Sequence, residues 1–401
     1  MCPTAIKKLR SDYMRLARRV REISSSVTLD ITSKAKKMKK EGIDVVNFGA
    51  GEPDFDTPRH VKDSAIAAIN EGFTKYTPSS GMPELREAIS KKFKVDNSLD
   101  YAPAQIIVSN GAKHSLYNIF QAICDAGDEV IIPSPYWLSY PEMVKLNEGI
   151  PIFVNTKKEN GFKVTAKELA SKINKKTKAF ILNSPSNPTG CVYGEKELRD
   201  IAALAVKHKF FIISDEIYEK LIYDDKKHFS IASFGKDIYD LAFTVNGVSK
   251  SYSMTGWRIG YAAGPADVMK AISNLQSHAA SNPSSISQRA ALAALTQDQG
   301  CVEEMREEFE KRRNLMLERI SRIREISCVR PEGAFYVFCD ISGLKMDSIT
   351  LSNRLLDEAK VAVIPGEPFG ADSFIRLSFA TGVSNIEKGI NRMEEWINKA
   401  H

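Results

Sequence analysis

Short continuous runs of apolar residues alternate with longer amphipathic stretches between about residue 62 and residue 296. The runs are rich in β-branched and aromatic residues and lie at residues 106–108, 130–132, 150–154, 179–182, 210–213 and 241–245. Runs of this kind, separated by helical stretches, are typical of parallel strands that are covered on both faces. The pattern therefore predicts an α/β domain built on a mostly parallel sheet.

The pattern changes near both ends of the chain. A long charged helix is expected over 302–325, and beyond it we expect helices near 349–359 and 385–399 and strands at 335–338, 361–364 and 374–379. Near the N-terminus, a helix over 28–41 ends at Gly42 and precedes an apolar strand at 45–48. We expect residues 1–61 and 297–401 to form one smaller α+β domain beside a large domain at 62–296.

Length and composition agree with a soluble protein of two domains. The 401 residues exceed the roughly 250–300 at which a single core stops growing. No apolar run approaches the ~18–20 residues of a membrane span, and the N-terminus lacks the apolar core of a secretory signal. The six cysteines are widely spaced without a Cys-x-x-Cys pair, so we expect no metal site, no disulfide framework and a cytoplasmic location.

The formal net charge of +6 arises at the N-terminus. Residues 1–40 hold 12 Lys and Arg and three acidic residues, so the rest of the chain is slightly acidic. A nucleic-acid-binding domain needs basic residues clustered on one folded face. We therefore expect neither a nucleic-acid partner nor a membrane partner.

Polar residues follow several of the predicted strands, at the sheet edge where open α/β folds bind ligands. Gly111, Ala112 and Lys113 open a helix after the strand at 106–108, and a helix N-terminus can receive an anion. Asn187 lies in a loop that contains two prolines and a glycine. Asp215 closes a buried strand, where a carboxylate must be paired. Each of these features has a plain structural alternative: a small turn, a surface loop and a helix cap.

Lys250 follows the strand at 241–245 and lies eight residues before Arg258. Most lysines are solvated, but partial burial near another cation lowers the pKa of a lysine and lets its amine form a Schiff base with a carbonyl group. An anion cradle, a carboxylate, an amide and an imine-forming lysine together fit pyridoxal 5'-phosphate, a phosphate-bearing aldehyde whose ring nitrogen pairs with an aspartate.

From about residue 20 to residue 398 the chain resembles the class I, fold-type I, pyridoxal-phosphate-dependent aminotransferases. The resemblance is closest to the bacterial branch of aspartate and aspartate/prephenate aminotransferases. Its motifs are residues 50–58 (AGEPDFDTP), 75–76 (KY), 134–137 (SPYW), 183–190 (NSPSNPTG), 214–218 (SDEIY), 249–250 (SK), 256–261 (GWRIGY) and 375–378 (IRLS). The resemblance implies a large domain with a seven-stranded sheet, a smaller α+β domain and a homodimer with shared active sites.

The resemblance also implies how the cofactor is held. Lys250 is expected to form the Schiff base and then to shuttle protons, Asp215 to keep the ring nitrogen protonated, and Asn187 and Tyr218 to bind the phenolic oxygen of the ring. Trp137 is expected to stack on the ring, unless it is only a core aromatic. The phosphate is expected to bind Gly111, Ala112, Lys113, Ser249 and Arg258, together with Tyr76 of a neighbouring subunit.

The residues that the resemblance implies for substrate binding are Gly51, Trp137, Asn187, Arg376 and Lys113. Arg376 and the backbone of Gly51 are expected to bind the α-carboxylate, because a guanidinium matches a carboxylate in two parallel hydrogen bonds. In the resembling branch, the lysine at the position of Lys113, helped by a hydroxyl at Ser26 or Thr28, binds the distal carboxylate. Lys113 could also be only a neighbour of the phosphate. Many relatives carry serine where this chain has Gly247, so one phosphate-binding hydroxyl is absent.

The expected activity is transfer of the amino group of aspartate to 2-oxoglutarate by a ping-pong route through Lys250. Amino acids and 2-oxo acids are the expected partners. Two alternatives stay open: transamination of prephenate to arogenate, and a lyase reaction on the same fold. A non-enzymatic regulator would need an added DNA-binding module, for which residues 1–20 leave no room.

Overall fold

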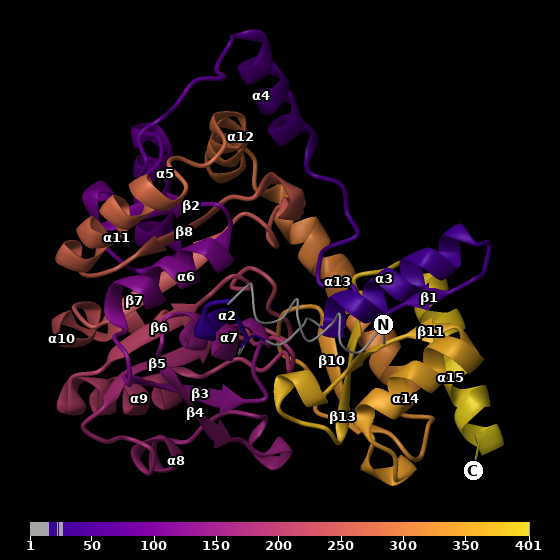
Figure 1. Ribbon diagram of the computed structural model, residues 1–401. Coiled ribbons are helices and arrows are strands. Elements are labelled where there is room, and N and C mark those ends of the chain that lie inside the picture. The colour runs from indigo at the N-terminus through magenta and orange to yellow at the C-terminus, as the bar shows by residue number, and fades with distance from the viewer. Residues whose placement is uncertain (1–15, 22, 24–26, 401) are drawn as a thin grey trace, which may run out of the picture.

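The computed structural model of the chain describes residues 16–21, 23 and 27–400. Its centre is a seven-stranded sheet with the order β2-β8-β7-β6-β5-β3-β4 (Figure 1). The strands are β2 (Ile106–Ser109), β3 (Glu129–Ser134), β4 (Ile150–Asn155), β5 (Thr177–Asn183), β6 (Phe211–Asp215), β7 (Ala242–Gly247) and β8 (Gly260–Ala263). Every pairing is parallel except those of β8 with β2 and β7. The predicted mostly parallel α/β sheet is confirmed.

Alternate residues of the strands enter two separate hydrophobic cores, because successive side chains point to opposite faces of a sheet. Ile212 of β6 contributes to one core and Ile213 to the other. The first core is covered by α5 (Pro83–Asn97), α9 (Glu195–His208) and α12 (Ser285–Thr296). The second is covered by α6 (Ala112–Ile123), α7 (Ser139–Leu146) and α11 (Ala266–Ala279). Burial on both faces explains why these strands are continuously apolar.

A second, smaller set of strands is built largely from the C-terminal part of the chain. Its sheet has the order β12-β13-β10-β9 and is antiparallel, with β9 (Ser327–Cys328), β10 (Tyr336–Asp340), β12 (Ile364–Pro365) and β13 (Phe374–Ser378). A separate parallel pair joins β1 (Val46–Asn47) to β11 (Val361–Ala362). Residues 46–47 and 361–362, which are far apart in the sequence, therefore lie side by side.

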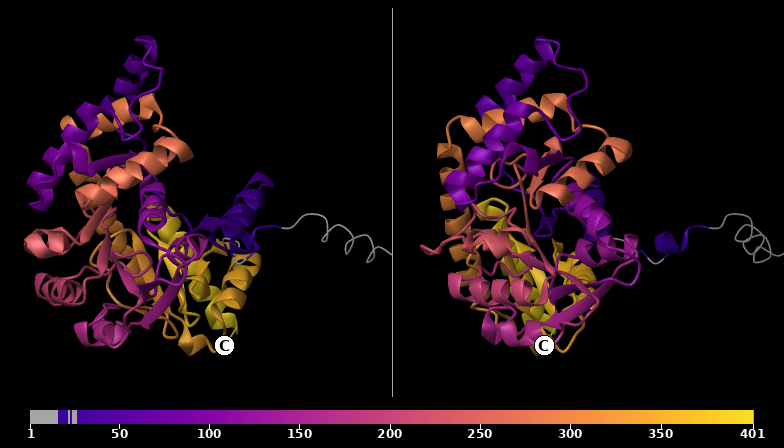
Figure 2. Two further views of the ribbon diagram at one scale, coloured as in Figure 1. Left: turned by 60° about the vertical axis from the view of Figure 1, so that its left-hand side comes forward. Right: turned by 90° about the vertical axis from the view of Figure 1, so that its left-hand side faces the viewer.

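The helices of this part are α3 (Val27–Lys40), α13 (Gly300–Ile320), α14 (Ser348–Arg354) and α15 (Val383–Ala400). Figure 1 shows α3, α14 and α15 gathered at one side of the molecule. At the other end, α4 (Arg59–Asn70) packs against α12 and projects from the body (Figure 2). The remaining α-helices are α2 (Arg18–Arg21), α8 (Ala166–Ala170) and α10 (Lys236–Tyr239).

Three predicted elements differ from the structure. The long helix predicted to reach residue 325 ends at Ile320, and the buried Ile323 and Ile326 continue its apolar spacing through tight turns instead. The strand predicted at 361–364 is divided into β11 and β12, which belong to different sheets. The helix predicted over 349–359 consists of α14 followed by a π-helical turn at Leu355–Ala359.

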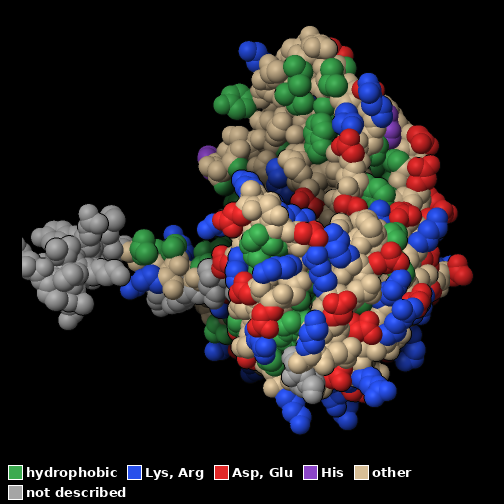
Figure 3. Space-filling model, turned by 90° about the vertical axis from the view of Figure 1, so that its right-hand side faces the viewer, with side chains coloured by type: hydrophobic (Ala, Val, Ile, Leu, Met, Phe, Trp, Pro, Cys, Tyr) green, Lys and Arg blue, Asp and Glu red, His purple; other side chains and the backbone are tan. Residues whose placement is uncertain are grey.

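One face of the molecule carries charged side chains of both signs. Figure 3 shows Lys and Arg side chains interspersed with Asp and Glu over one face of the molecule. Among the described residues, no helix is both long and apolar enough to cross a membrane.

The loop that carries Asn187 is attached to the C-terminal part of the chain through Gly190. The carbonyl of Gly190 accepts hydrogen bonds from the amides of Glu332 and Gly333, both at 2.9 Å. Gly190 has a φ of +69°, and a Cβ added there would lie 2.4 Å from Cβ of Pro331. The loop therefore requires glycine for both conformation and space.

We predict that Gly190→Ala lowers the free energy of unfolding by about 2–4 kcal/mol, because strain at positive φ adds to the steric clash. Gly127→Ala is the matched control, because Gly127 has a φ of +91° with nothing within 4 Å of an added Cβ. It should cost only about 1 kcal/mol. Urea unfolding of both variants measures the difference, and equal losses would contradict the role given to the contact with Pro331.

Candidate active site

A cavity of about 420 Å³ opens at the carboxyl edge of the large sheet, within the size range of small-molecule sites. Its wall combines the ends of β5, β6 and β7 with residues from near both ends of the chain. Of the residues predicted for the site, its wall contains Gly51, Ala112, Lys113, Trp137, Asn187, Asp215, Tyr218, Ser249, Lys250, Arg258 and Arg376. Gly111 directly precedes the wall residue Ala112 at the start of α6, whereas Tyr76 does not line the cavity.

Asp215 ends β6 with its side chain buried at the base of the cavity. Its carboxylate accepts hydrogen bonds from the Tyr140 hydroxyl at 2.7 Å and from the Ile217 amide at 3.3 Å. Burial raises the pKa of Asp215 to about 6, although both hydrogen bonds oppose the shift. No Lys, Arg or His among the described residues forms an ion pair with it within 4 Å. A protonated ring nitrogen would supply the missing positive partner.

Lys250 lies in the turn after β7 and points into the cavity. Its ammonium donates a hydrogen bond of 2.6 Å to the carbonyl of Gly51. Burial lowers the pKa of Lys250 to about 8, assisted by the positive charges of Arg376 and Arg258 and opposed by Glu52. With this pKa roughly a tenth of the amine is neutral at pH 7, and nucleophilic attack on a carbonyl requires the neutral form.

The first turn of α6 and Arg258 form an anion-binding corner. Arg258 donates to the carbonyl of Asn110 at 3.2 Å and to that of Thr255 at 3.0 Å. A Cβ added to Gly111 would lie 2.5 Å from this guanidinium, so glycine permits the close approach. Ser249 and the amide end of α6 face the same cavity. A guanidinium beside the N-terminus of a twelve-residue helix fits a phosphate group.

Arg376 is a buried guanidinium with unused donor capacity. It is 2% exposed and donates to the side-chain oxygen of Asn187 at 2.9 Å and to the carbonyl of Gly49 at 3.1 Å. Its Nε has no hydrogen-bond partner, and no carboxylate among the described residues pairs with it. The guanidinium also lies 4.3 Å from the ring centroid of Tyr336. A buried cation without an acidic partner at a cavity wall fits a substrate carboxylate.

Two predicted aromatic residues have identifiable contacts. The hydroxyl groups of Tyr218 and Tyr336 are 2.9 Å apart, and burial holds the pKa of Tyr218 well above its usual value. Trp137 is only partly buried, lines the cavity and packs edge-on against Tyr140. The ammonium of Lys113 lies 4.7 Å from the Trp137 ring centroid. Trp137 is therefore available to a ligand in addition to packing on Tyr140.

Several cavity residues were not found from the sequence. They are Thr32, Lys36, Glu52, Tyr140, Thr255 and Tyr336. Tyr140 comes three residues after Trp137 of the 134–137 motif, just inside the start of α7 at Ser139, and this spacing was the available signal. Thr32 and Lys36 belong to α3, which carries the expected Thr28 one turn earlier. Ser26 lies outside the described residues, and the side chain of Thr28 is not described.

Close packing explains why glycine, and not the serine of many relatives, fits at position 247. A Cβ at this position would lie 3.0 Å from both Cα of Gly260 and the carbonyl oxygen of Ile259. A serine here would require β8 to shift. Ser249 remains the hydroxyl residue nearest to this point of the chain that lines the cavity.

The chain is similar to known proteins over most of its length. The sequence profile of the family "Aminotransferase class I and II" matches residues 43–393. An aspartate aminotransferase of Bacillus sp. (strain YM-2) is 51% identical over 387 residues, which cover 95% of this chain and 99% of that protein. A probable aspartate/prephenate aminotransferase of Aquifex aeolicus is 49% identical, covering 95% of this chain and 98% of that protein.

Solved structures show the same similarity. The aspartate aminotransferase from Thermus thermophilus with maleate superposes with a TM-score of 0.92 at 45% identity, covering 95% of this chain and all of that one. Pyridoxal 5'-phosphate is the cofactor of such aminotransferases. Its ring nitrogen, phosphate and aldehyde fit, in this order, the carboxylate of Asp215, the anion-binding corner and the amine of Lys250. The chain belongs to the class I and II aminotransferase family.

Proposed function

We propose that this aminotransferase transfers the amino group of aspartate to 2-oxoglutarate by a ping-pong route. The observation that carries the proposal is the pair of cations at the cavity, Arg376 without an acidic partner and Lys113 beside Trp137. Two cations suit substrates with two carboxylates. The names of the relatives, aspartate aminotransferase at 50–51% identity, support the same choice.

Each carboxylate has a suitable receptor. Arg376 is held in place by Asn187 and Gly49, so its free donor edge is ordered before a substrate binds. Preorganised donors lose little conformational entropy on binding. Burial and the nearby Arg258 lower the pKa of Lys113, so an anionic ligand would favour its charged form. We assign the α-carboxylate to Arg376 and the distal carboxylate to Lys113.

The residues of the chain account for the proton transfers. When bound, pyridoxal phosphate supplies an electrophilic carbonyl carbon and a ring that withdraws electrons. The Nζ of Lys250, with its pKa of about 8, can remove the proton of the substrate α-carbon and deliver it again as a general base and acid. Asp215 would hold the proton of the ring nitrogen, and Asn187 and Tyr218 would orient the phenolic oxygen.

We further propose a homodimer that shares its active sites. Tyr76 is 91% exposed and lies outside the cavity of its own chain, while Ile66 and Ile69 on α4 are 54% and 53% exposed. Apolar side chains grouped on a projecting helix suit a subunit interface. In such a dimer Tyr76 would reach the phosphate of the neighbouring site. We also propose 62–296 and 1–61 with 297–401 as the domain limits and the cytoplasm as the location.

Prephenate is a second candidate amino acceptor. It is also a dicarboxylic oxo acid, and Thr32 and Lys36 add a hydroxyl and a cation to the cavity wall beside Lys113. Relatives named as probable aspartate/prephenate aminotransferases are 47–49% identical to this chain. A panel of aspartate, glutamate, alanine and phenylalanine as donors, with 2-oxoglutarate and prephenate as acceptors, tests both candidates. Aspartate with 2-oxoglutarate should give the highest kcat/KM, and ammonia release without an acceptor would indicate a lyase.

The first prediction from the active site concerns substrate selectivity. Lys113→Met should lower kcat/KM for aspartate about 10–100-fold, which is the cost of one contact to a charged group. Its effect on phenylalanine should stay within about threefold, because this donor has no distal carboxylate. Lys196→Met, on the surface of α9 and away from the cavity, is the matched control and should change neither value. Equal losses for both donors would show that Lys113 serves the cofactor alone.

The second prediction concerns the reactivity of Lys250. In the apoprotein, labelling of Lys250 by an amine-reactive reagent should rise through a midpoint near pH 8, because only the neutral amine reacts. Peptide mass spectrometry measures the labelled fraction, and Lys196 on the surface of α9 reports the pH dependence of the reagent itself. A midpoint near pH 10 would contradict the lowered pKa of Lys250.

The third prediction concerns the stability of the apoprotein. Since burial raises the pKa of Asp215 to about 6, its ionised form destabilises the folded state above that pH. Asp215→Asn should therefore stabilise the apoprotein by about 3 kcal/mol at pH 7.5, and the gain should shrink as the pH falls toward 4. The same variant should bind pyridoxal phosphate more weakly. Urea unfolding at several pH values checks the first effect, and an apoprotein destabilised at pH 7.5 would contradict it.

A further inference from the structure

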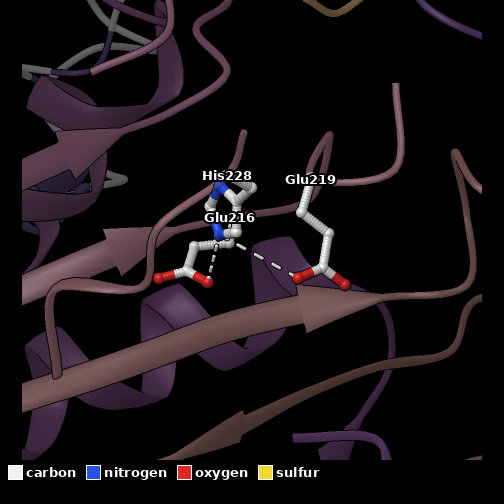
Figure 4. A group of neighbouring side chains, drawn as sticks. All are labelled: Glu216, Glu219 and His228. Atoms are coloured by element: carbon white, nitrogen blue, oxygen red, sulfur yellow. Dashed lines mark hydrogen bonds and ion pairs between the residues drawn. The ribbon is translucent and has the colours of Figure 1, made fainter. Parts of the chain in front are cut away.

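A cluster of charged side chains lies buried behind the turn that follows β6. It consists of Glu216, Glu219 and His228, which Figure 4 shows, together with Lys92, and we call it the buried charge cluster. Glu216 is 1% exposed and Glu219 8%, and the side chains of Lys92 and His228 are 8% and 10% exposed. Burial of so many charges is costly unless they are paired, so their arrangement needs a reason.

The turn after β6 has two faces. Asp215 and Tyr218, three residues apart, line the cavity. Glu216 and Glu219, also three residues apart, enter the buried charge cluster instead. The amide of Glu219 donates to the carbonyl of Glu216 at 2.9 Å, which closes the turn. The residues of one short segment thus alternate between the cofactor site and the cluster.

The cluster holds Glu216 tightly. Its carboxylate accepts hydrogen bonds from the hydroxyl of Ser214 at 2.8 Å and from that of Ser230 at 2.6 Å, and it lies 2.8 Å from Nε2 of His228. The Asn97 amide reaches both Glu216, at 3.3 Å, and Glu219, at 2.7 Å. Residues of α5 and of the chain at 228–230 therefore clamp the turn from behind.

Two basic residues face the two carboxylates of the cluster, and Lys92 also lies 3.7 Å from a carboxylate oxygen of Asp96. Lys92 forms an ion pair with Glu219, and this attraction, with that of His228, outweighs burial and lowers the pKa of Glu219 to about 2. Burial disfavours a charged His228, but the attraction and hydrogen bond of Glu216 raise its pKa above the usual value. Lys92 already supplies the cation that Glu219 needs, which argues against a metal ion held by Glu216, Glu219 and His228.

We propose that Glu216 and His228 are positioning residues, which fix the turn after β6 so that Asp215 and Tyr218 face the cofactor site. The inference rests on the proposed role of Asp215. Neither residue touches the cavity, so they act only through the turn. Tyr140 holds the carboxylate of Asp215 from the other side at 2.7 Å, and the turn is fixed between the two supports.

The test compares cofactor binding with stability. His228→Leu removes the support of Glu216 and should raise the dissociation constant for pyridoxal phosphate about tenfold, the size of one lost charge-assisted hydrogen bond. His228→Gln keeps a donor and should recover most of the affinity. His208→Leu, on the exposed end of α9, is the matched control and should leave the affinity unchanged. Thermal unfolding of each apoprotein is measured in parallel.

A double-mutant cycle distinguishes a role in positioning Asp215 from a purely structural role. If His228 and Tyr140 both act on Asp215, His228→Leu and Tyr140→Phe should be non-additive in cofactor affinity by about threefold or more. A lower melting temperature with unchanged cofactor affinity in His228→Leu would overturn the proposal. If His228→Leu does not fold, Glu216→Gln, which keeps the size of the side chain and removes its charge, takes its place. Its cofactor affinity should fall about threefold or more, and an unchanged affinity would overturn the proposal.

Three further outcomes are distinguishable. If Asp215→Asn itself leaves cofactor affinity unchanged, the proposed role of Asp215 fails, and the inference fails with it. If Asp215→Asn weakens binding but the cluster variants do not, only the inference fails. Stoichiometric binding of Zn²⁺ that His228→Leu abolishes would show a metal site and overturn the proposal.

Discussion

The structure depends on one constraint, the burial of an aspartate carboxylate at the end of a central strand, where no cation of the described residues pairs with it. Within the part of the chain that the structure describes, the carboxylate of Asp215 is satisfied only by the hydroxyl of Tyr140 and the amide of Ile217, and its raised pKa reflects the cost of burial. Arg376 is likewise a buried charged group, a cation that no carboxylate of the described residues pairs with. A folded protein can keep such groups if a ligand supplies their partners, and the binding free energy then offsets part of the destabilisation.

The two sheets bring these charged groups together in one cavity. β5, β6 and β7 bring Asn187, Asp215 and Lys250 to one edge of the large sheet, while β13 brings Arg376 from the smaller sheet. The hydrogen bonds of Gly190 to Glu332 and Gly333 tie the two parts together next to the site. Long-range contacts of this kind explain why the site is assembled from segments far apart in the sequence.

Sequence patterns predicted the large sheet well because its strands are buried on both faces and therefore read as continuous apolar runs. They missed β8, which is only four residues long and begins at Gly260 within a motif read for its chemistry. The residues at strand ends could be predicted because the fold places them at the ligand edge. Tyr336 and Lys36 could not, since each reaches the cavity through tertiary packing that no local spacing records, whereas the local signal for Tyr140 was its spacing from Trp137. The buried charge cluster was missed for the same reason as Tyr336 and Lys36, because Lys92 of α5 is distant in sequence from Glu216 and Glu219.

The most direct test of the constraint is the protonation state of the cofactor ring nitrogen in the holoprotein. ¹⁵N NMR of bound pyridoxal phosphate labelled at this nitrogen reports whether it carries a proton. If the ring supplies the missing positive charge, the nitrogen stays protonated at pH 7.5 in the wild type and loses its proton in Asp215→Asn. An unprotonated nitrogen in the wild type at this pH would contradict the pairing on which the interpretation of the site depends.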